Sequence, residues 1–123
     1  MIEKRPPGQP PASYRLDGAT ALFYRRVSRA ELASIRTLGR FSPPPGGIPE
    51  GKYLTTTPKL AREWGEQMVA CGWEIEVGTV VAVRVGAATA ERICYVGEID
   101  GIGACYFADF DELAAAEISE LNQ

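Results

Sequence analysis

Three short stretches of the sequence carry polar side chains whose types and spacing could hold an anion or stabilise a cation. They are the arginine pair in Tyr24-Arg25-Arg26, the hydroxyl row Thr55-Thr56-Thr57, and an acid-rich segment between Glu98 and Glu112. A guanidinium can hold a phosphate through two parallel hydrogen bonds. A carboxylate can stabilise the cationic sugar that forms when a glycosidic bond breaks. Each stretch also has a structural explanation, as a solvated arginine, an ordinary strand threonine or a helix cap.

The sequence contains no histidine, which narrows the chemistry. Ser-His-Asp and Cys-His nucleophile systems, imidazole zinc sites and histidine-based proton transfer are excluded. Cys71, Cys94 and Cys105 have no CxxC spacing, so we expect no metal site and favour buried, reduced thiols over a disulfide. An enzyme built from this chain must work with carboxylates, hydroxyls, arginines and aromatic residues.

Composition favours one globular domain preceded by a short arm. The chain has 123 residues, of which 46% are hydrophobic and 24% charged. Residues 1–19 are rich in proline and glycine and predict an extended arm, which leaves 20–123 as the domain. Residues 1–18 lack the apolar stretch of a secretory signal, and no apolar run approaches the roughly 18 residues that span a bilayer. A net charge of −3 makes nucleic acid an unfavoured partner.

The first half of the domain predicts two strands that each lead into a helix. Residues 21–27 have strand character, and Ser28 with Glu31 forms a capping-box pattern for a helix that Gly39 ends. Residues 52–56 form a second short strand. Thr57 then caps a helix that begins at Pro58 and runs to about residue 71.

The second half of the domain is richer in strand patterns. Residues 73–85 predict one or two strands, and 87–97 a short helix or turn followed by a strand. A last strand at 105–109 precedes a closing helix over 109–121. Strands and helices in this order predict a small α+β domain.

The order of the three polar stretches resembles a known family. An aromatic-arginine pair on the first strand, a hydroxyl triplet after an aromatic residue and a late acid are typical of small ADP-ribosyltransferase-fold toxin domains of bacterial polymorphic toxins. The resemblance covers residues 22–113 and implies a compact fold with split mixed or antiparallel sheets and flanking helices. The missing histidine leaves the Arg-Ser-Glu-like class, with threonine in place of serine throughout the triplet.

The resemblance also implies roles for individual residues. In that family the strand arginine, here Arg25, holds the phosphate and nicotinamide ribose of NAD, while the hydroxyl triplet braces the arginine and the catalytic acid. The implied NAD-binding set is Tyr24, Arg25, Tyr53, Thr55, Thr56 and Thr57, and the implied catalytic set is Arg25, Thr56, Glu98 and Asp100. Glu98 and Asp100 are the candidate acids because Asp109, Asp111 and Glu112 are explained by the start of the closing helix.

The expected function is NAD-dependent mono-ADP-ribosyl transfer by a bacterial toxin or effector domain. We expect a protein acceptor, action in the bacterial cytoplasm of a target cell, a cognate immunity protein as a further partner, and no metal. Two alternatives stay open: an NAD glycohydrolase on the same fold, and a non-catalytic module that binds an anionic ligand or a partner protein.

Overall fold

The computed structural model describes residues 14–43, 51–98 and 103–121, and within them the chain forms seven strands and four helices. In chain order these elements are β1 (Arg15–Asp17), β2 (Thr20–Val27), α1 (Arg29–Leu38), β3 (Gly51–Thr55), α2 (Pro58–Ala70), β4 (Thr79–Gly86), α3 (Ala87–Arg92), β5 (Cys94–Glu98), β6 (Ala104–Asp109), α4 (Phe110–Leu113) and β7 (Glu117–Glu120). The α+β class is confirmed.

The strands form one sheet in the order β5-β6-β3-β2-β4-β7, with β1 also paired to β2. Every strand pair in the described ranges is antiparallel, which is the second of the two expected alternatives, mixed or antiparallel. β2 pairs with β4 over its full length, but it meets β3 only where Tyr24 lies opposite Thr55. The sheet is therefore continuous, and a single residue pair joins its two halves.

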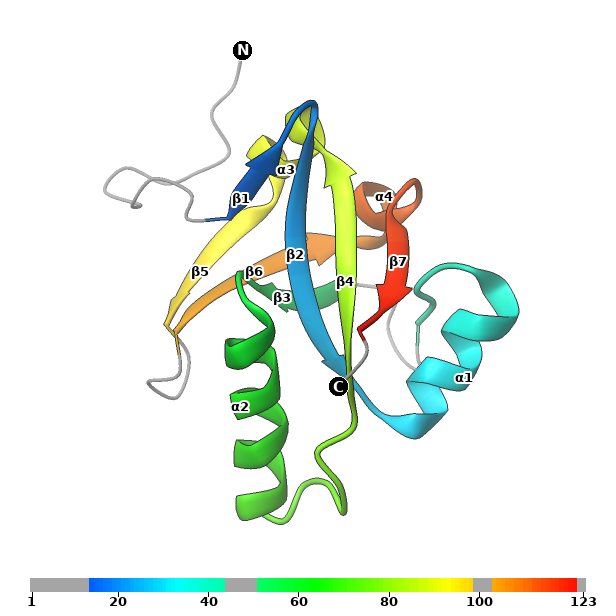
Figure 1. The fold of residues 1–123 in the computed structure, drawn as a ribbon, viewed down its shortest axis with the longest axis vertical. Coiled ribbons are helices and arrows are strands. Elements are labelled where there is room, and N and C mark those ends of the chain that lie inside the picture. The colour runs from blue at the N-terminus through cyan, green and yellow to red at the C-terminus, as the bar shows by residue number, and fades with distance from the viewer. Residues whose placement is uncertain (1–13, 44–50, 99–102, 122–123) are drawn as a thin grey trace.

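Beyond that pair, β2 and β3 separate. β2 continues through Arg25 to Val27, while β3 approaches from Gly51 through Leu54, and these stretches are not paired. In Figure 1, β3 and β6 run across the direction of β2 and β4, and α2 and α1 lie near the end where β2 finishes. The separation leaves a notch between the two halves of the sheet, close to α2.

Both faces of the central strands are buried. Ala21, Phe23 and Val27 of β2 lie on the face that packs into the main core with α1. Because side chains alternate along a strand, Tyr24 and Arg26 lie on the opposite face. Val80, Ala82 and Ala61 are buried there, where α2 packs on β2 and β4. Side chains of neighbouring residues of β2 therefore lie either in the main core or under α2.

The helix caps predicted from the sequence are confirmed. The Ser28 hydroxyl accepts from the Glu31 backbone N–H, and Gly39 ends α1 in the left-handed conformation with φ 73°. The Thr57 hydroxyl accepts from the Leu60 N–H at 3.1 Å, with Pro58 at the first helical position of α2. These caps fix the points at which two helices leave the notch.

The predicted closing helix is wrong beyond its first turn. α4 has only four residues, and β7 then pairs with the outer edge of β4. Ile118 packs against the core, and Arg36 binds Glu120 at 2.6 and 2.8 Å. A short helix is marginal by itself, so pairing with an open strand edge outweighs the helix propensity of the alanine run.

Two further boundaries differ from the expectation. β1 belongs to the segment 1–19 that was expected to be an arm, yet it pairs with β2, and Tyr14 packs on Phe23 with ring centroids 4.9 Å apart. The segment from Tyr14 to Asp17 therefore belongs to the folded domain, which was expected to begin at residue 20. Residues 73–85 contain one strand, β4, preceded by an irregular segment. The short helix and strand predicted in 87–97 correspond to α3 and β5.

Candidate functional site

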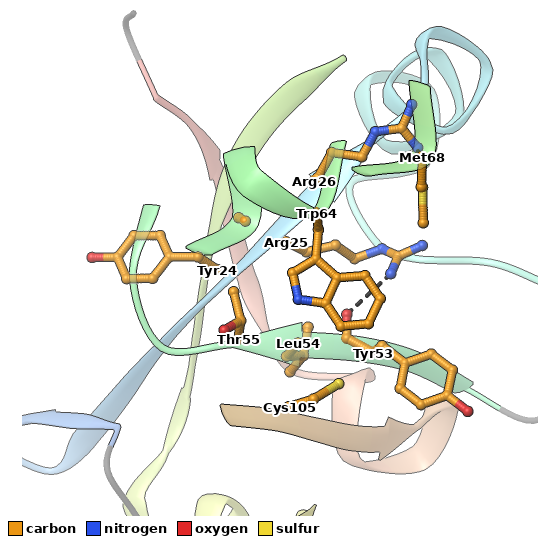
Figure 2. A pocket seen from close by; sticks show the side chains of 10 residues that line it. Tyr24, Arg25, Arg26, Tyr53, Leu54, Thr55, Trp64, Met68 and Cys105 are labelled. Carbon is orange, nitrogen blue, oxygen red and sulfur yellow. Dashed lines mark hydrogen bonds between the residues drawn. The ribbon is translucent and has the colours of Figure 1, made fainter. Parts of the chain in front are cut away.

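A pocket of about 160 Å³ opens at the notch between β2 and β3, beneath α2. Figure 2 shows the side chains that enclose it. Its walls are mostly apolar, and its charged groups come from neighbouring positions of β2. The lining residues are Tyr24, Arg25, Arg26, Tyr53, Leu54, Thr55, Ala61, Trp64, Met68 and Cys105.

Arg25 crosses the notch and links three elements. Its Nε and Nη2 donate to the two carboxylate oxygens of Glu31 at 2.8 and 2.9 Å, and its Nη1 donates to the Tyr53 carbonyl at 3.0 Å. The guanidinium thus bonds to a β3 backbone group that lacks a β2 partner. Three of its five N–H donors are engaged in these bonds, and 19% of the side chain is exposed. Two N–H donors remain for a ligand.

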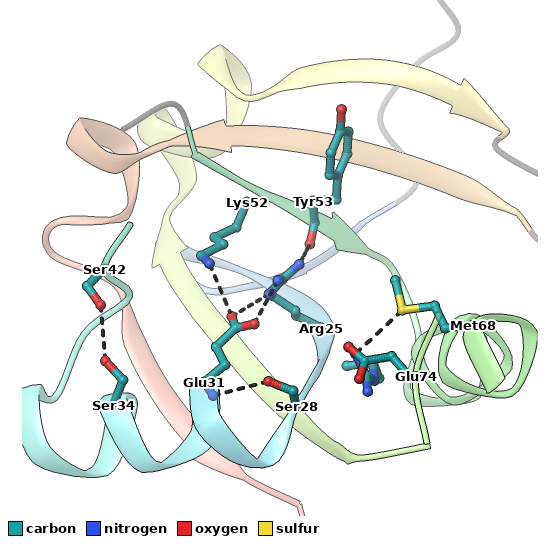
Figure 3. A network of polar contacts seen from close by, with 10 residues as sticks. Arg25, Ser28, Glu31, Ser34, Ser42, Lys52, Tyr53, Met68 and Glu74 are labelled. Carbon is teal, nitrogen blue, oxygen red and sulfur yellow. Dashed lines mark hydrogen bonds and ion pairs between the residues drawn. The ribbon is translucent and has the colours of Figure 1, made fainter. Parts of the chain in front are cut away.

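Glu31 is a member of this site that sequence reasoning had explained differently. Its carboxylate binds Arg25 instead of returning to the Ser28 N–H, and Lys52 Nζ lies 3.7 Å from it (Figure 3). Burial alone would raise the pKa of Glu31, but the hydrogen bonds and charge of Arg25, together with Lys52, hold it below the ordinary value. Burial lowers the pKa of Lys52. Two cationic side chains, Arg25 and Lys52, therefore flank the Glu31 carboxylate.

Arg26 has a structural role on the other face of β2. Its Nε donates to the Val77 carbonyl at 2.6 Å, its Nη2 to the Glu76 carbonyl at 3.2 Å, and its Nη1 to the Glu74 carboxylate at 3.2 Å. Only 7% of the side chain is exposed. Arg26 is therefore not a solvated arginine, because this part of the sheet is covered on both faces.

The three threonines have different environments. Thr55 is 3% exposed, lines the pocket and donates its hydroxyl to the Ala104 carbonyl of β6 at 2.8 Å. Thr56 is half-buried and lies outside the pocket lining. Thr57 is exposed and caps α2. Only the first hydroxyl of the row is thus brought beside Arg25.

The two tyrosines reach the pocket mainly through their backbones. Tyr53 supplies the carbonyl that Arg25 binds, while its ring is 49% exposed and packs on Phe107 at 5.1 Å. In Figure 2 the rings of Tyr24 and Tyr53 both point away from the centre of the group. They frame the notch rather than fill it.

The candidate acids lie mostly outside the described residues. Asp100 is not among them, and for Glu98 only the backbone is described, at the end of β5 opposite Ala104. Ala104 is also the residue whose carbonyl accepts from Thr55. Asp109 is explained by capping, since its carboxylate accepts from the Glu112 N–H at 2.7 Å and Glu112 returns a bond of 3.0 Å.

Sequence reasoning missed the apolar half of the pocket. Trp64 and Met68 were not among the expected site residues, yet both line the pocket beside Leu54 and Cys105. The four-residue spacing of Trp64 and Met68 was the available signal, because it puts both side chains on the helix face that meets the strands. The Trp64 indole nitrogen is buried and has no hydrogen-bond partner among the described residues. Leaving such a donor unpaired costs about 1–3 kcal/mol.

The thiols are reduced, as expected, but not all are buried. Cys71 is exposed, Cys94 is half-buried and Cys105 is buried, and all three are free. Burial raises the pKa of Cys105 to about 11, against the smaller opposing effect of the Arg25 charge. Across the described ranges, the carboxylates and thiols form no group of three or more that could hold a metal ion.

Comparison with protein-family models, with curated proteins and with solved structures finds no match in any of the three. In the part of the chain that the structure describes, no helix combines the length and apolarity that crossing a membrane requires.

Proposed function

We propose that this protein is an NAD-dependent mono-ADP-ribosyltransferase whose substrate binds at the notch between β2 and β3. The observation that carries the proposal is Arg25, which stands in the notch beside Thr55 with two N–H donors left for a ligand. The order of aromatic-arginine, hydroxyl triplet and late acid supports it independently, as the motif order of the toxin domains that the sequence resembles. The α+β sheet with diverging halves is compatible with that fold.

The size and apolar lining of the pocket suit a flat ring, so we assign the pocket to a ring of the substrate. An engineered apolar cavity of about 150 Å³ holds one benzene ring, and this pocket has a volume of about 160 Å³. Nicotinamide is a ring of this size. The rest of the dinucleotide would extend over the protein surface, with a phosphate on the guanidinium of Arg25.

In the proposed reaction the bond between nicotinamide and ribose breaks, and both bonding electrons leave with nicotinamide. The ribose carbon becomes cationic, and a carboxylate stabilises it electrostatically. A nucleophile on the acceptor then attacks this carbon and loses its proton. Glu98 and Asp100 remain the candidate acids; the backbone pairing of Glu98 with Ala104, whose carbonyl binds Thr55, supports Glu98.

The proposed biological role is that of a bacterial toxin or effector domain acting in the cytoplasm of a target cell. A net charge of −3 favours a protein acceptor over a nucleic acid. A toxin with this activity requires a cognate immunity protein in the cell that makes it. Water in place of the acceptor would make the protein an NAD glycohydrolase.

A non-catalytic binding module is the second candidate, and one observation favours it. Glu31 already holds Arg25 through two hydrogen bonds, as in a structural ion pair. An incoming phosphate must share Arg25 with that carboxylate. A protein that only binds an anionic ligand or partner would need no catalytic acid beside the pocket.

Nicotinamide release separates these functions. Purified protein is incubated with NAD labelled in its adenosine, with and without bacterial lysate, and free nicotinamide and labelled protein are measured. Release that needs lysate and labels protein supports the transferase, whereas release in buffer alone identifies the glycohydrolase. Ligand binding without release would identify the binding module and contradict the proposal.

Substitutions of the arginines test the site itself. Arg25→Ala should weaken NAD binding at least about tenfold, because it removes charge-assisted hydrogen bonds to phosphate. Arg26→Ala should leave NAD affinity nearly unchanged and lower the free energy of unfolding, since Arg26 holds the carbonyls of Glu76 and Val77. Arg36→Ala, which removes an exposed ion pair with Glu120, is the control. Equal losses of affinity for the Arg25 and Arg26 variants would refute the assignment.

The acid is tested in the same release assay. Glu98→Gln or Asp100→Asn should abolish nicotinamide release in a folded protein. Asp109→Asn should cost only stability, about 1 kcal/mol for a lost helix cap. Loss of nicotinamide release in the Asp109 variant alone would show that the catalytic acid lies at the end of β6 and would contradict the assignment to Glu98 or Asp100.

A further inference from the structure

The indole of Trp64 contains a hydrogen-bond donor that the described part of the chain leaves without an acceptor. Its Nε1 has less than 1 Å² of exposed surface and no partner there. An indole nitrogen can only donate, and buried polar groups in native proteins are nearly always paired. The atom belongs to a residue of the pocket wall, so a ligand in the pocket is a natural source of the missing acceptor.

The surroundings of Trp64 define what kind of ligand could supply that acceptor. Leu54, Met68 and Cys105 make the neighbouring wall apolar, and the free volume of about 160 Å³ suits one flat ring. In Figure 2 the nitrogen edge of the indole is turned toward Thr55, whose hydroxyl donates to the Ala104 carbonyl and does not accept a bond from the indole. A ring with a carbonyl group would satisfy both the apolar wall and the donor.

We infer that Trp64 makes the pocket selective for a flat ring that carries a carbonyl oxygen, by donating its indole N–H to that oxygen. Because the nitrogen is enclosed, the indole turns toward the free volume of the pocket when the ligand enters. The identity of the ring rests on the proposed function: in NAD it is nicotinamide, and the carbonyl is that of its carboxamide. The selectivity for a carbonyl rests on Trp64 and the pocket alone.

The chain contains its own control for this contact. It has two tryptophans, and the other, Trp73, is 72% exposed and lies outside the pocket lining. Each indole N–H gives a separate proton–nitrogen NMR signal, and a Trp73→Phe variant assigns them. The probes are nicotinamide and 3-methylpyridine, which is a similar ring with a methyl group in place of the carboxamide.

Titration of the wild-type protein should shift the Trp64 signal downfield with nicotinamide, as a new hydrogen bond requires. 3-Methylpyridine should bind without that shift, and neither probe should move the Trp73 signal. A Trp64 signal that is unaffected by nicotinamide, or is moved equally by both probes, overturns the inference. Absence of binding by either probe overturns it as well.

A Trp64→Phe variant gives a second measurement, because it keeps an aromatic ring and removes the N–H donor together with the five-membered ring of the indole. Nicotinamide affinity should fall about threefold to tenfold, and 3-methylpyridine affinity should change less than about twofold. An unchanged ratio of the two affinities would contradict the inference.

These outcomes are distinguishable from those of the proposed function. Selective nicotinamide binding without any NAD turnover would support the role of Trp64 and contradict the proposed transferase activity. NAD turnover, together with an unchanged ratio of nicotinamide to 3-methylpyridine affinity in Trp64→Phe, would support the enzymatic activity and contradict the role of Trp64.

Discussion

At the scale of single residues, the molecule separates two adjacent arginines by function. Arg25 and Arg26 differ by one position on β2, so they lie on opposite faces of the sheet. Arg25 meets Glu31 of α1 at the open notch, whereas Arg26 holds the segment before β4 through backbone carbonyls. The first lines the pocket beside Thr55, and the second binds backbone carbonyls within the fold.

Glu31 gives a pH-dependent prediction. Its folded pKa lies below the ordinary 4.5 because Arg25 and Lys52 outweigh its burial. A carboxylate with a lowered folded pKa contributes stability that is complete above its unfolded pKa and is lost as the pH falls through the folded pKa. Glu31→Gln should therefore lower the free energy of unfolding by about 1–3 kcal/mol at pH 7, and by progressively less below about pH 4.5.

Urea unfolding of both proteins at pH 7 and at pH 3.5 measures this difference. Glu120→Gln is the matched control, since it removes the carboxylate of an exposed ion pair with Arg36, and exposed pairs contribute little. A Glu31 effect of the same size at both pH values would show that its charge is not what stabilises the protein.

At the scale of elements, the site depends on how closely α2 approaches the strands. Gly65 faces Arg26 and the segment before β4: a Cβ added there would lie 2.5 Å from the Val77 carbonyl oxygen and 2.7 Å from Val77 Cγ1. Its neighbour Trp64 forms a wall of the pocket. The missing side chain lets α2 sit close enough to cover the notch.

Gly65→Ala should consequently destabilise the protein, although alanine is the better helix former by about 1 kcal/mol. We expect a net loss of about 1–3 kcal/mol from overpacking, measured by thermal or urea unfolding. Gly86→Ala is the control, because Gly86 has φ −61° and its nearest neighbour is Thr89 Oγ1 at 3.9 Å. A stabilised Gly65→Ala protein would show that α2 is free to move away from the strands.

At the scale of the whole molecule, the sheet holds its two halves together without a disulfide. β2 and β3 share one residue pair, and Arg25 adds a bond to the Tyr53 carbonyl across the gap. Phe23 and Tyr106, from opposite halves, pack in the core with ring centroids 5.3 Å apart. Apolar packing from both halves therefore supports a junction that has few backbone hydrogen bonds.

The free thiols should report on this packing. Alkylation with iodoacetamide at pH 8, followed by mass spectrometry, should modify exposed Cys71 first. Cys105 should react only after unfolding, because burial raises its pKa to about 11 and the thiolate is the reactive form. A reductant should leave the melting temperature unchanged, and a fall in melting temperature would indicate a disulfide in the purified protein.

The sequence by itself determined the features that depend on neighbouring residues. The caps at Ser28, Thr57 and Gly39 place the helix boundaries, since a cap forms within one turn of the chain. Strand character at 21–27, 52–56 and 105–109 likewise locates β2, β3 and β6 to within a residue. The resemblance to the toxin domains, which rests on the order of short motifs, named Arg25 and Thr55 as candidates for a site.

Only the tertiary structure decided the features that depend on distant partners. Glu31 had the pattern of half a capping box, but the notch brings Arg25 to its carboxylate, and Trp64 lines the pocket only because α2 packs over that notch. The segment 117–120 became a strand because β4 offers it an open edge. Such choices follow from pairing and burial between segments far apart in the chain, which outweigh the small local preferences of the residues themselves.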